Sequence, residues 1–457
     1  MVQSVAARDF GEVFTPHWMV SDMLDSIKSD ITDFTHTILD LCAGRGAFIL
    51  EALDRRMKLT STHQSLLDAL ATLYAAELQE VNVSIIKHEM MERVSPFLED
   101  DELEKAKSII DANIAACDVI ESGIPFDIHF DAIVSNPPYQ RNIAGTGTRN
   151  RSKSVPFYPE FWNLAKGAHP KRMVFIIPAK WYSGGWGLDA WRQEMLDDSH
   201  IVSLVDYRES HSVFEGVEVN GGVCWLLRDE TKDNAGKVSV LRFNGDNDPI
   251  ERSSRPLREE GMDIFVRDGQ AVPILRRIRS FIDKKGSVSS MMLGTTPFGI
   301  PSDYVTKCDW SDDDDGIHDV PVYVIKRKTV WMPKSEVKRG EEAINEWKAF
   351  LPLCFNQSSP QVVGVPKVGA PGEACSHSYI CVHGFSMREE AESFVSYTRT
   401  KAFRFIVFLM KISPVMTRKV YSLVPMIPWD REYDDDSVYR LFGLSDDEIQ
   451  HVENSVE

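Results

Sequence analysis

Short apolar runs alternate with segments of helical hydrophobic spacing along the first part of the chain. Four apolar runs, at residues 38–41, 72–76, 113–117 and 132–135, have the length of buried strands and are separated by longer stretches. After the first run, apolar residues recur at the spacing of one helix face within residues 47–53. Strands that alternate with helices build an α/β sheet. The pattern therefore predicts an α/β fold for this part of the chain.

Each predicted strand is followed by a residue suited to ligand binding. Gly44 and Gly46 follow the first strand, Glu77 the second, Asp118 the third and Asn136 the fourth. Open α/β sheets bind ligands at the carboxyl ends of their strands. Glycines let a ligand approach the backbone, a following helix offers free N–H groups, and an acidic side chain after the second strand accepts hydrogen bonds from ribose hydroxyls. This order predicts a nucleotide-type cofactor site.

The tetrapeptide Asn136-Pro137-Pro138-Tyr139 carries the most specific chemistry. A planar amino nitrogen becomes nucleophilic when its two N–H groups donate to acceptors that bring it toward tetrahedral geometry. The Asn136 Oδ1 and the Pro137 carbonyl are two such acceptors, and proline holds the carbonyl in place without adding a donor. Tyr139 would stack on a planar base. For the tetrapeptide alone, a simple turn that ends a strand remains an open interpretation.

Three features together resemble a known family: the glycine turn, the tetrapeptide, and the segment Phe10-Gly11-Glu12-Val13-Phe14-Thr15-Pro16. The family is that of the amino-group DNA methyltransferases that use S-adenosylmethionine, in particular the adenine-N6 enzymes of bacterial restriction-modification systems. The order of cofactor element, glycine turn, tetrapeptide and recognition region corresponds to their gamma class. The resemblance implies a Rossmann-like α/β methyltransferase core followed by a C-terminal target-recognition domain.

The resemblance also implies roles for individual residues. At the amino-acid end of the cofactor, Thr15 is expected to contact the methionine moiety, and Asp40 with the backbone of Ala43 and Gly44 the terminal groups. Glu77 is expected to bind the ribose. Asp118 would bind the adenine amine, and Pro138 would lie on the adenine face. Gly46 joins the cofactor-binding turn, although Asp40 and Cys42 stand where many members have Asp-Pro. Asn136, Pro137 and Tyr139 are the expected catalytic residues. In related enzymes an aromatic residue packs on the flipped base, and Phe214 is the candidate; an ordinary core phenylalanine remains the alternative.

The second half of the chain has fewer motifs. Segments at residues 396–405, 420–425 and 439–444, with Lys411, resemble the C-terminal portion of restriction-modification methylases, and the first of them is expected to be a basic, aromatic helix. Residues 237–395 contain no motif, as is expected where base readout depends on a few side chains. We therefore expect a catalytic domain at residues 1–235 and a recognition region at residues 236–457.

Composition argues mildly against a nucleic-acid partner. The chain has 69 acidic and 51 basic residues and a formal charge of −18, whereas DNA binding gains from counterion release by Lys and Arg. Much of the acidic charge lies in short runs of acidic residues, as at residues 312–315 and 434–436. Basic residues cluster at Arg141, Arg149, Arg151 and Lys153, and at Lys326, Arg327, Lys328, Lys334, Lys338 and Arg339 around Trp331. Both DNA contact and a solvated surface remain open for each cluster.

The cysteines indicate a reducing compartment. The chain has seven cysteines, scattered along its length, which suits the cytoplasm. No apolar stretch is long enough to span a membrane. Cys375, His377, Cys381 and His383 have the ligand types of a zinc site, but their spacing matches no common zinc motif. We therefore expect no metal.

The expected activity is methylation of the N6 amine of an adenine flipped out of double-stranded DNA, with S-adenosylmethionine as the cofactor. The protein would be the modification component of a restriction-modification or related defence system, with a separate endonuclease or defence subunit as a possible partner. Three alternatives stay open. They are a methyltransferase acting on an amino or amide nitrogen of RNA or protein, a bifunctional restriction enzyme, and a DNA-binding subunit of a defence complex. Cytosine-N4 methylation is also open.

Overall fold

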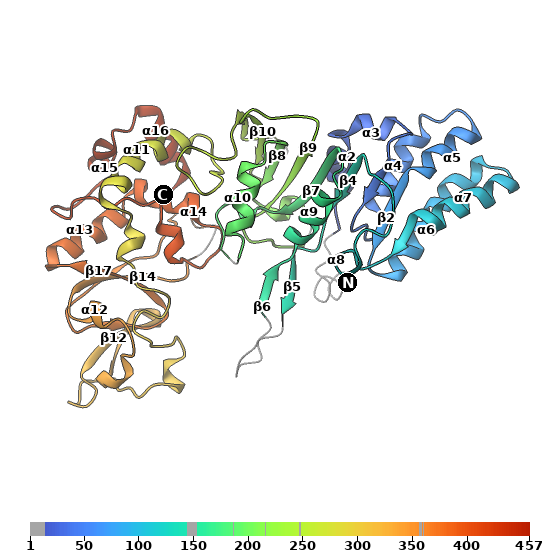
Figure 1. The fold of residues 1–457 in the computed structure, drawn as a ribbon. Coiled ribbons are helices and arrows are strands. Elements are labelled where there is room, and N and C mark those ends of the chain that lie inside the picture. The colour runs from blue at the N-terminus through green and yellow to red at the C-terminus, as the bar shows by residue number, and fades with distance from the viewer. Residues whose placement is uncertain are drawn as a thin grey trace. The chain divides into compact units, whose positions relative to one another are not determined.

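A computed structural model describes residues 14–143, 153–185, 187–214, 216–245, 248–355, 359 and 361–457. The chain forms two compact units, Met1–Phe265 and Val266–Glu457 (Figure 1). Residues 10–13 of the expected cofactor element and the basic residues Arg149 and Arg151 lie outside the described residues.

The first unit is built on one large sheet. Within the described residues this sheet has nine strands in the order β11-β10-β8-β9-β7-β4-β1-β2-β3. The strands are β1 (Ile38–Asp40), β2 (Leu73–Glu77), β3 (Ile114–Ala116), β4 (Ala132–Ser135), β7 (Arg172–Pro178), β8 (Ile201–Tyr207), β9 (Val223–Asp229), β10 (Val238–Phe243) and β11 (Glu251–Arg255). From β3 to β7 neighbouring strands run parallel, and β9 lies antiparallel between β7 and β8. The expected Rossmann-like α/β fold is confirmed, including the four strands predicted from the apolar runs.

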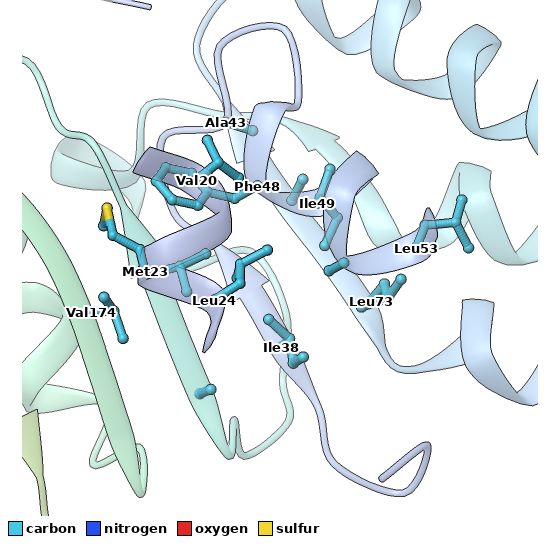
Figure 2. Packing of buried hydrophobic residues seen from close by; sticks show 14 of the residues in the cluster. Val20, Met23, Leu24, Ile38, Ala43, Phe48, Ile49, Leu53, Leu73 and Val174 are labelled. Carbon is cyan, nitrogen blue, oxygen red and sulfur yellow. The ribbon is translucent and has the colours of Figure 1, made fainter. Parts of the chain in front are cut away.

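Helices pack on both faces of this sheet (Figure 1). They are α2 (His17–Asp25), α3 (Lys28–Thr32), α4 (Ala47–Met57), α5 (His63–Ala71), α6 (Glu80–Val94), α7 (Asp100–Asn113), α8 (Val119–Ser122), α9 (Tyr158–Gly167) and α10 (Asp189–Asp197). Successive strand residues point to opposite faces. Accordingly Ile38 belongs to the core beneath α2 and α4, whereas the next residue, Leu39, belongs to the core beneath α9. Figure 2 shows Leu24 of α2 and Ile49 of α4 in the first of these cores, with Ile38 and Leu73 of the strands.

The first unit extends past the expected boundary between residues 235 and 236. Strand β10 pairs parallel with β8, and β11 pairs antiparallel with β10, so both continue the same sheet. Phe265, the last residue of the unit, packs against it: the centroid of its ring lies 4.7 Å from the centroid of the Tyr182 ring. The structural boundary therefore falls between Phe265 and Val266.

The second unit contains two small sheets and a group of helices. In the described residues the sheets are β13-β12-β16 and β15-β14-β17. Their strands are β12 (Val320–Val324), β13 (Lys328–Met332), β14 (Trp347–Pro352), β15 (Lys367–Gly369), β16 (Ala374–Cys375) and β17 (Tyr379–Phe385). The helices are α11 (Ala271–Lys285), α12 (Glu341–Ile344), α13 (Arg388–Thr398), α14 (Lys401–Met410), α15 (Asp435–Phe442) and α16 (Asp446–Ser455). Phe350 and Tyr379 contribute to an apolar core that both sheets share.

The expected single helix at residues 396–405 is wrong. Helix α13 ends at Thr398 and α14 begins at Lys401, because Thr400 is extended and its side chain caps α14 by accepting from the Phe403 N–H at 3.3 Å. Phe403 and Phe405 are fully buried, so the apolar stripe of this segment belongs to the core.

The residues with the ligand types of a zinc site are buried or hydrogen-bonded within the second unit. Cys375 and Cys381 are buried, His377 contacts the Thr296 hydroxyl at 2.9 Å, and His383 contacts Glu346 at 2.9 Å. Among the described residues, no group of three or more His, Cys, Asp or Glu side chains is arranged to hold a metal ion. Likewise, no helix in the described ranges combines the length and the apolarity needed to cross a membrane.

Candidate active site

A pocket of about 460 Å³ opens at the carboxyl ends of β1, β2, β3 and β4. Eight of the residues expected from the sequence line it: Thr15, Ala43, Gly44, Glu77, Asp118, Asn136, Pro137 and Pro138. They come from a segment before α2, the glycine turn and the ends of three strands, so the sheet topology gathers residues that are far apart in sequence. Asp40, Gly46, Tyr139 and Phe214 do not line the pocket.

The two glycines of the turn have different roles. Both have left-handed backbone, with φ of +53° at Gly44 and +87° at Gly46. A Cβ on Gly44 would meet no atom within 4 Å, and Gly44 lines the pocket. A Cβ on Gly46 would lie 2.9 Å from Ile86 Cγ1 of α6. Gly44 therefore keeps the pocket open, whereas Gly46 lets α6 pack closely on the turn.

Glu77 ties the glycine turn to the end of β2. Its side chain is 7% exposed, and one carboxylate oxygen accepts from the Gly44 N–H at 2.9 Å. The other accepts from the Gln79 N–H at 3.0 Å and from the Asn82 amide at 3.3 Å. A carboxylate offers about four acceptor positions. Glu77 thus orients the turn while it remains at the pocket wall.

Asp118 is held by the start of α8. Its Oδ1 accepts from the backbone N–H groups of Ile120 at 3.0 Å and Glu121 at 3.2 Å. These two bonds fix the plane of the carboxylate. The other oxygen, Oδ2, is the one that can accept from a ligand in the pocket.

Asp40 lies beneath the turn rather than in the pocket. It is fully buried at the end of β1, and burial, followed by the neighbouring Glu77 carboxylate, raises the pKa of Asp40 to about 8. Burial therefore favours the protonated form of this carboxyl group.

The tetrapeptide directly follows β4, and its first residue contacts the segment before α2. The Asn136 Nδ2 donates to the Thr15 Oγ1 at 2.9 Å, across 121 positions of sequence. Asn136 and Pro138 are half-buried and Pro137 is buried. The amide that sequence analysis assigns to catalysis thus stands at the wall of the pocket, beside a residue assigned to the cofactor.

Tyr139 and Phe214 pack together in the core. They are 9% and 2% exposed, and their ring centroids lie 6.5 Å apart at an angle of 58°. Burial raises the pKa of the Tyr139 hydroxyl well above its usual range. The Tyr139 carbonyl accepts from the Phe157 N–H at 3.1 Å, which holds the end of the tetrapeptide. In this structure both rings are therefore interior side chains.

The hairpin after the tetrapeptide contributes a basic residue to the pocket. Strands β5 (Gln140–Ile143) and β6 (Lys153–Pro156) pair antiparallel. Arg141 lines the pocket, binds Glu160 at 2.8 Å and lies 4.6 Å above the centre of the Phe157 ring. Arg141 is thus partly neutralised by its own unit.

Sequence reasoning missed several lining residues, among them Cys42, Cys117, Phe157 and Phe161. The two cysteines lie directly at strand ends, beside the glycine turn and Asp118, so their position was a usable signal. Phe157 and Phe161 have the i, i+4 spacing of one helix face, which does not distinguish a pocket wall from an ordinary core.

A mixed α/β sheet with a parallel part, a cofactor-type pocket and an Asn-Pro-Pro-Tyr turn at the carboxyl edge of that part defines the class of Rossmann-like methyltransferases. Residues 26–214 match the family described as Eco57I restriction-modification methylase. The resemblance to restriction-modification methylases is thereby confirmed for this segment.

A curated protein and two solved structures are also similar to this chain. An "Uncharacterized adenine-specific methylase" of Mycoplasma pneumoniae is 28% identical over 99 residues, which cover 21% of this chain and 23% of that protein. The solved structure of the Type ISP restriction-modification enzyme LlaGI, a nuclease-deletion mutant in complex with a DNA substrate mimic, has a TM-score of 0.52 and 10% identity. The match covers 97% of this chain and 46% of that one.

The Type IIL restriction-modification enzyme MmeI in complex with DNA has a TM-score of 0.50 and 9% identity, over 92% of this chain and 68% of that one. At this level of identity, the matches to LlaGI and MmeI show that this chain has a similar fold, and no more than that. Both matches run through the second unit as well as the first. The chain covers less than a quarter of the curated relative and under half of LlaGI.

Proposed function

We propose that the protein is a site-specific DNA methyltransferase that transfers a methyl group to the N6 amine of adenine, as the modification component of a restriction-modification or related defence system. The observation that carries this proposal is the position of Asn136 and Pro137 at the wall of a cofactor-sized pocket. The family match of residues 26–214 and the adenine-specific methylase among the relatives support it.

S-adenosylmethionine is the proposed cofactor, because the residues present fit it. The pocket lies within the usual volume range of small-molecule sites, and Gly44 leaves open space for close approach. Thr15 would contact the methionine part, Glu77 the ribose and Asp118, through Oδ2, the adenine amine. When bound, this cofactor supplies an electrophilic methyl group on a sulfonium.

Asn136 and Pro137 would align the target amine. Their two carbonyl oxygens accept its N–H groups, which turns the nitrogen lone pair toward the methyl carbon. The bound cofactor would supply the methyl group and would leave as a neutral thioether that keeps the electron pair of the carbon–sulfur bond, and the methylated amine would lose its proton to solvent. Alignment and stabilisation of the positive charge that develops on nitrogen account for the catalysis, with no covalent protein intermediate.

The target base must leave the duplex to reach this turn. Tyr139 and Phe214 pack on one another, so stacking of a flipped adenine on Tyr139 requires a change in this pair of rings. We propose that Tyr139 turns toward the base when DNA binds, and that Phe214 either follows it or stays as its support.

The test of the proposed function starts with unmethylated genomic DNA and labelled S-adenosylmethionine. Nucleosides from the digested DNA should contain labelled N6-methyladenine. Asn136→Ala should lose turnover by a factor of roughly a hundred or more, because it removes one of the two oriented acceptors, while cofactor affinity measured by calorimetry stays within about threefold. Wild-type turnover in this variant would refute the assignment.

The same assay separates the alternatives. Label in RNA or protein, but not in DNA, would indicate a methyltransferase acting on another amino or amide nitrogen. Cofactor binding without transfer to any of these would indicate a DNA-binding subunit that needs a partner. Each of the seven cysteines stays outside any disulfide, which supports a cytoplasmic location.

A further inference from the structure

One hydrogen bond joins the proposed cofactor element to the proposed catalytic amide. The Asn136 Nδ2 donates to the Thr15 Oγ1 at 2.9 Å, and both residues line the pocket. Both side chains are partly buried, so water competes only weakly for this bond.

Thr15 is held firmly in place. It precedes Pro16, the N-cap of α2, whose carbonyl accepts from the Met19 and Val20 N–H groups. The apolar face of α2, including Met19, Val20 and Met23, is buried in the core. Figure 2 shows Val20 and Met23 of α2 within this core. The hydroxyl of Thr15 thus sits on a fixed helix start rather than on a free segment.

The two ends of an asparagine amide have opposite hydrogen-bonding character. Oδ1 accepts and Nδ2 donates two hydrogens. A target amine also donates, so an amide rotated by half a turn would set donor against donor. Nothing in the shape of the side chain selects one orientation, since the two ends are almost the same size. An acceptor on the Nδ2 side selects the orientation that leaves Oδ1 for the target amine, and Thr15 Oγ1 is such an acceptor in this structure.

We propose that Thr15 is a positioning residue that sets the orientation of the Asn136 amide, so that Oδ1 faces the target amine. The inference rests on the proposed function for its catalytic consequence, but the orientation itself is a property of the protein alone. A hydroxyl has one hydrogen and two lone pairs. Accepting from Asn136 uses a lone pair and leaves the hydrogen to be donated to an acceptor in the pocket. A ligand there that accepts this hydrogen strengthens the bond to Asn136.

Thr15→Val tests the proposal, because valine keeps the shape and removes the acceptor. At saturating S-adenosylmethionine, kcat should fall roughly tenfold to a hundredfold, since the Asn136 amide loses the partner that orients it. Thr15→Ser keeps the hydroxyl and should restore kcat to within about threefold of wild type. Thr60→Val is the matched control: its hydroxyl donates to the Met57 carbonyl at the end of α4, and it does not line the pocket.

A second readout needs no catalysis. In protein labelled with ¹⁵N-asparagine, the side-chain amide signals of Asn136, assigned through Asn136→Ala, should shift in Thr15→Val and return in Thr15→Ser. Added S-adenosylhomocysteine should slow hydrogen exchange of this amide in wild type and not in Thr15→Val. Melting temperatures close to that of wild type establish that the variants fold.

The outcomes separate the inference from the proposed function. If wild type methylates adenine but Thr15→Val changes only cofactor affinity, with kcat and the Asn136 signals unchanged, Thr15 is not a positioning residue. The same holds if Thr15→Ser is as slow as Thr15→Val. If wild type does not methylate DNA while the Asn136 signals follow the Thr15 hydroxyl, the proposed function fails and the positioning role stands.

Discussion

At the scale of single residues, the glycine turn shows that similar motif positions meet different constraints. Gly44 and Gly46 share a left-handed backbone, but only Gly46 is in close contact with another helix. A motif of two glycines does not reveal this difference, because it depends on where α6 packs. We therefore expect substitution of Gly46 to lower mainly the stability, and substitution of Gly44 to weaken mainly ligand binding.

Alanine at each glycine tests that separation. Gly46→Ala should lower the free energy of unfolding by about 1–3 kcal/mol, since it combines a left-handed backbone with contact to Ile86. Gly44→Ala should cost less stability, because its Cβ position is open, and should weaken S-adenosylmethionine binding more. Denaturant unfolding and calorimetry measure the two effects. Equal losses of stability with unchanged binding in Gly44→Ala would contradict this division.

Asp40 predicts a pH dependence of stability with a definite sign. An unfolded aspartate ionises near pH 4, whereas the pKa of Asp40 in the folded protein is about 8. Between these values the folded state binds more protons than the unfolded state, so Asp40 makes stability fall as pH rises from about 4 to 8, by at most about 1.4 kcal/mol per pH unit. Above pH 8 this contribution is constant.

Asp40→Asn should remove that dependence, because asparagine stays neutral. The melting temperature of the variant relative to wild type should rise between pH 5 and pH 8 and then level off. Asp111→Asn, at an exposed carboxylate on α7, is the control and should give a difference that does not vary over this range. A constant difference for Asp40→Asn as well would show that Asp40 is ionised in the folded protein.

At the scale of secondary-structure elements, the β12–β13 hairpin gives one basic cluster a definite shape. Lys326 and Arg327 occupy its turn with φ of +63° and +61°, a conformation that non-glycine residues adopt at a cost. Ile325, Lys326, Arg327 and Lys328 are all exposed. Lys328 binds Asp312 at 2.5 Å, so part of the cluster is neutralised locally. The tip that remains cationic is short and exposed, which suits contact with a DNA groove or backbone.

Replacing the tip residues tests that contact. Lys326→Ala with Arg327→Ala should weaken DNA binding and reduce the slope of log affinity against log salt by up to about 2, one unit for each lost phosphate contact. Lys284→Ala with Lys285→Ala on α11 removes the same charge from exposed positions of the same unit and is the matched control. Equal effects of the two pairs would mean that only net charge matters.

At the scale of the whole molecule, the position of the boundary between the two units determines which fragments can fold on their own. Strands β10 and β11 complete the large sheet, and Val238 and Val240 are buried in the core beneath α9 and α10. Phe265 contacts Tyr182 and lies under the Arg255 guanidinium at 4.8 Å. A fragment ending at residue 235 would lose all of these contacts and would expose the edge of β8.

Two fragments distinguish the boundaries. Residues 1–265 should unfold cooperatively by circular dichroism and bind S-adenosylmethionine with an affinity within about tenfold of the full chain. Residues 1–235 should aggregate or unfold without a sharp transition, because an unpaired strand edge and apolar side chains are exposed. A well-folded 1–235 fragment would show that β10 and β11 belong to a separate folding unit.

The parts predicted from the sequence are those with local causes. Apolar runs of strand length marked β1, β2, β3 and β4, and eight of the twelve proposed site residues line one pocket because parallel strands end at the same edge. One of the errors also has a local cause. The segment 396–405 has an apolar stripe typical of a helix, but the cap at Thr400 divides it.

The sequence by itself determined the α/β class, the chemistry at the strand ends and the resemblance to restriction-modification methylases, since each depends on neighbouring residues. The tertiary structure alone decided that Asp40, Tyr139 and Phe214 are interior, that β9 lies between β7 and β8, and that Thr15 meets Asn136. These depend on contacts between residues distant along the chain. Such contacts form only when the packing of the whole sheet brings them together, and no local pattern encodes them.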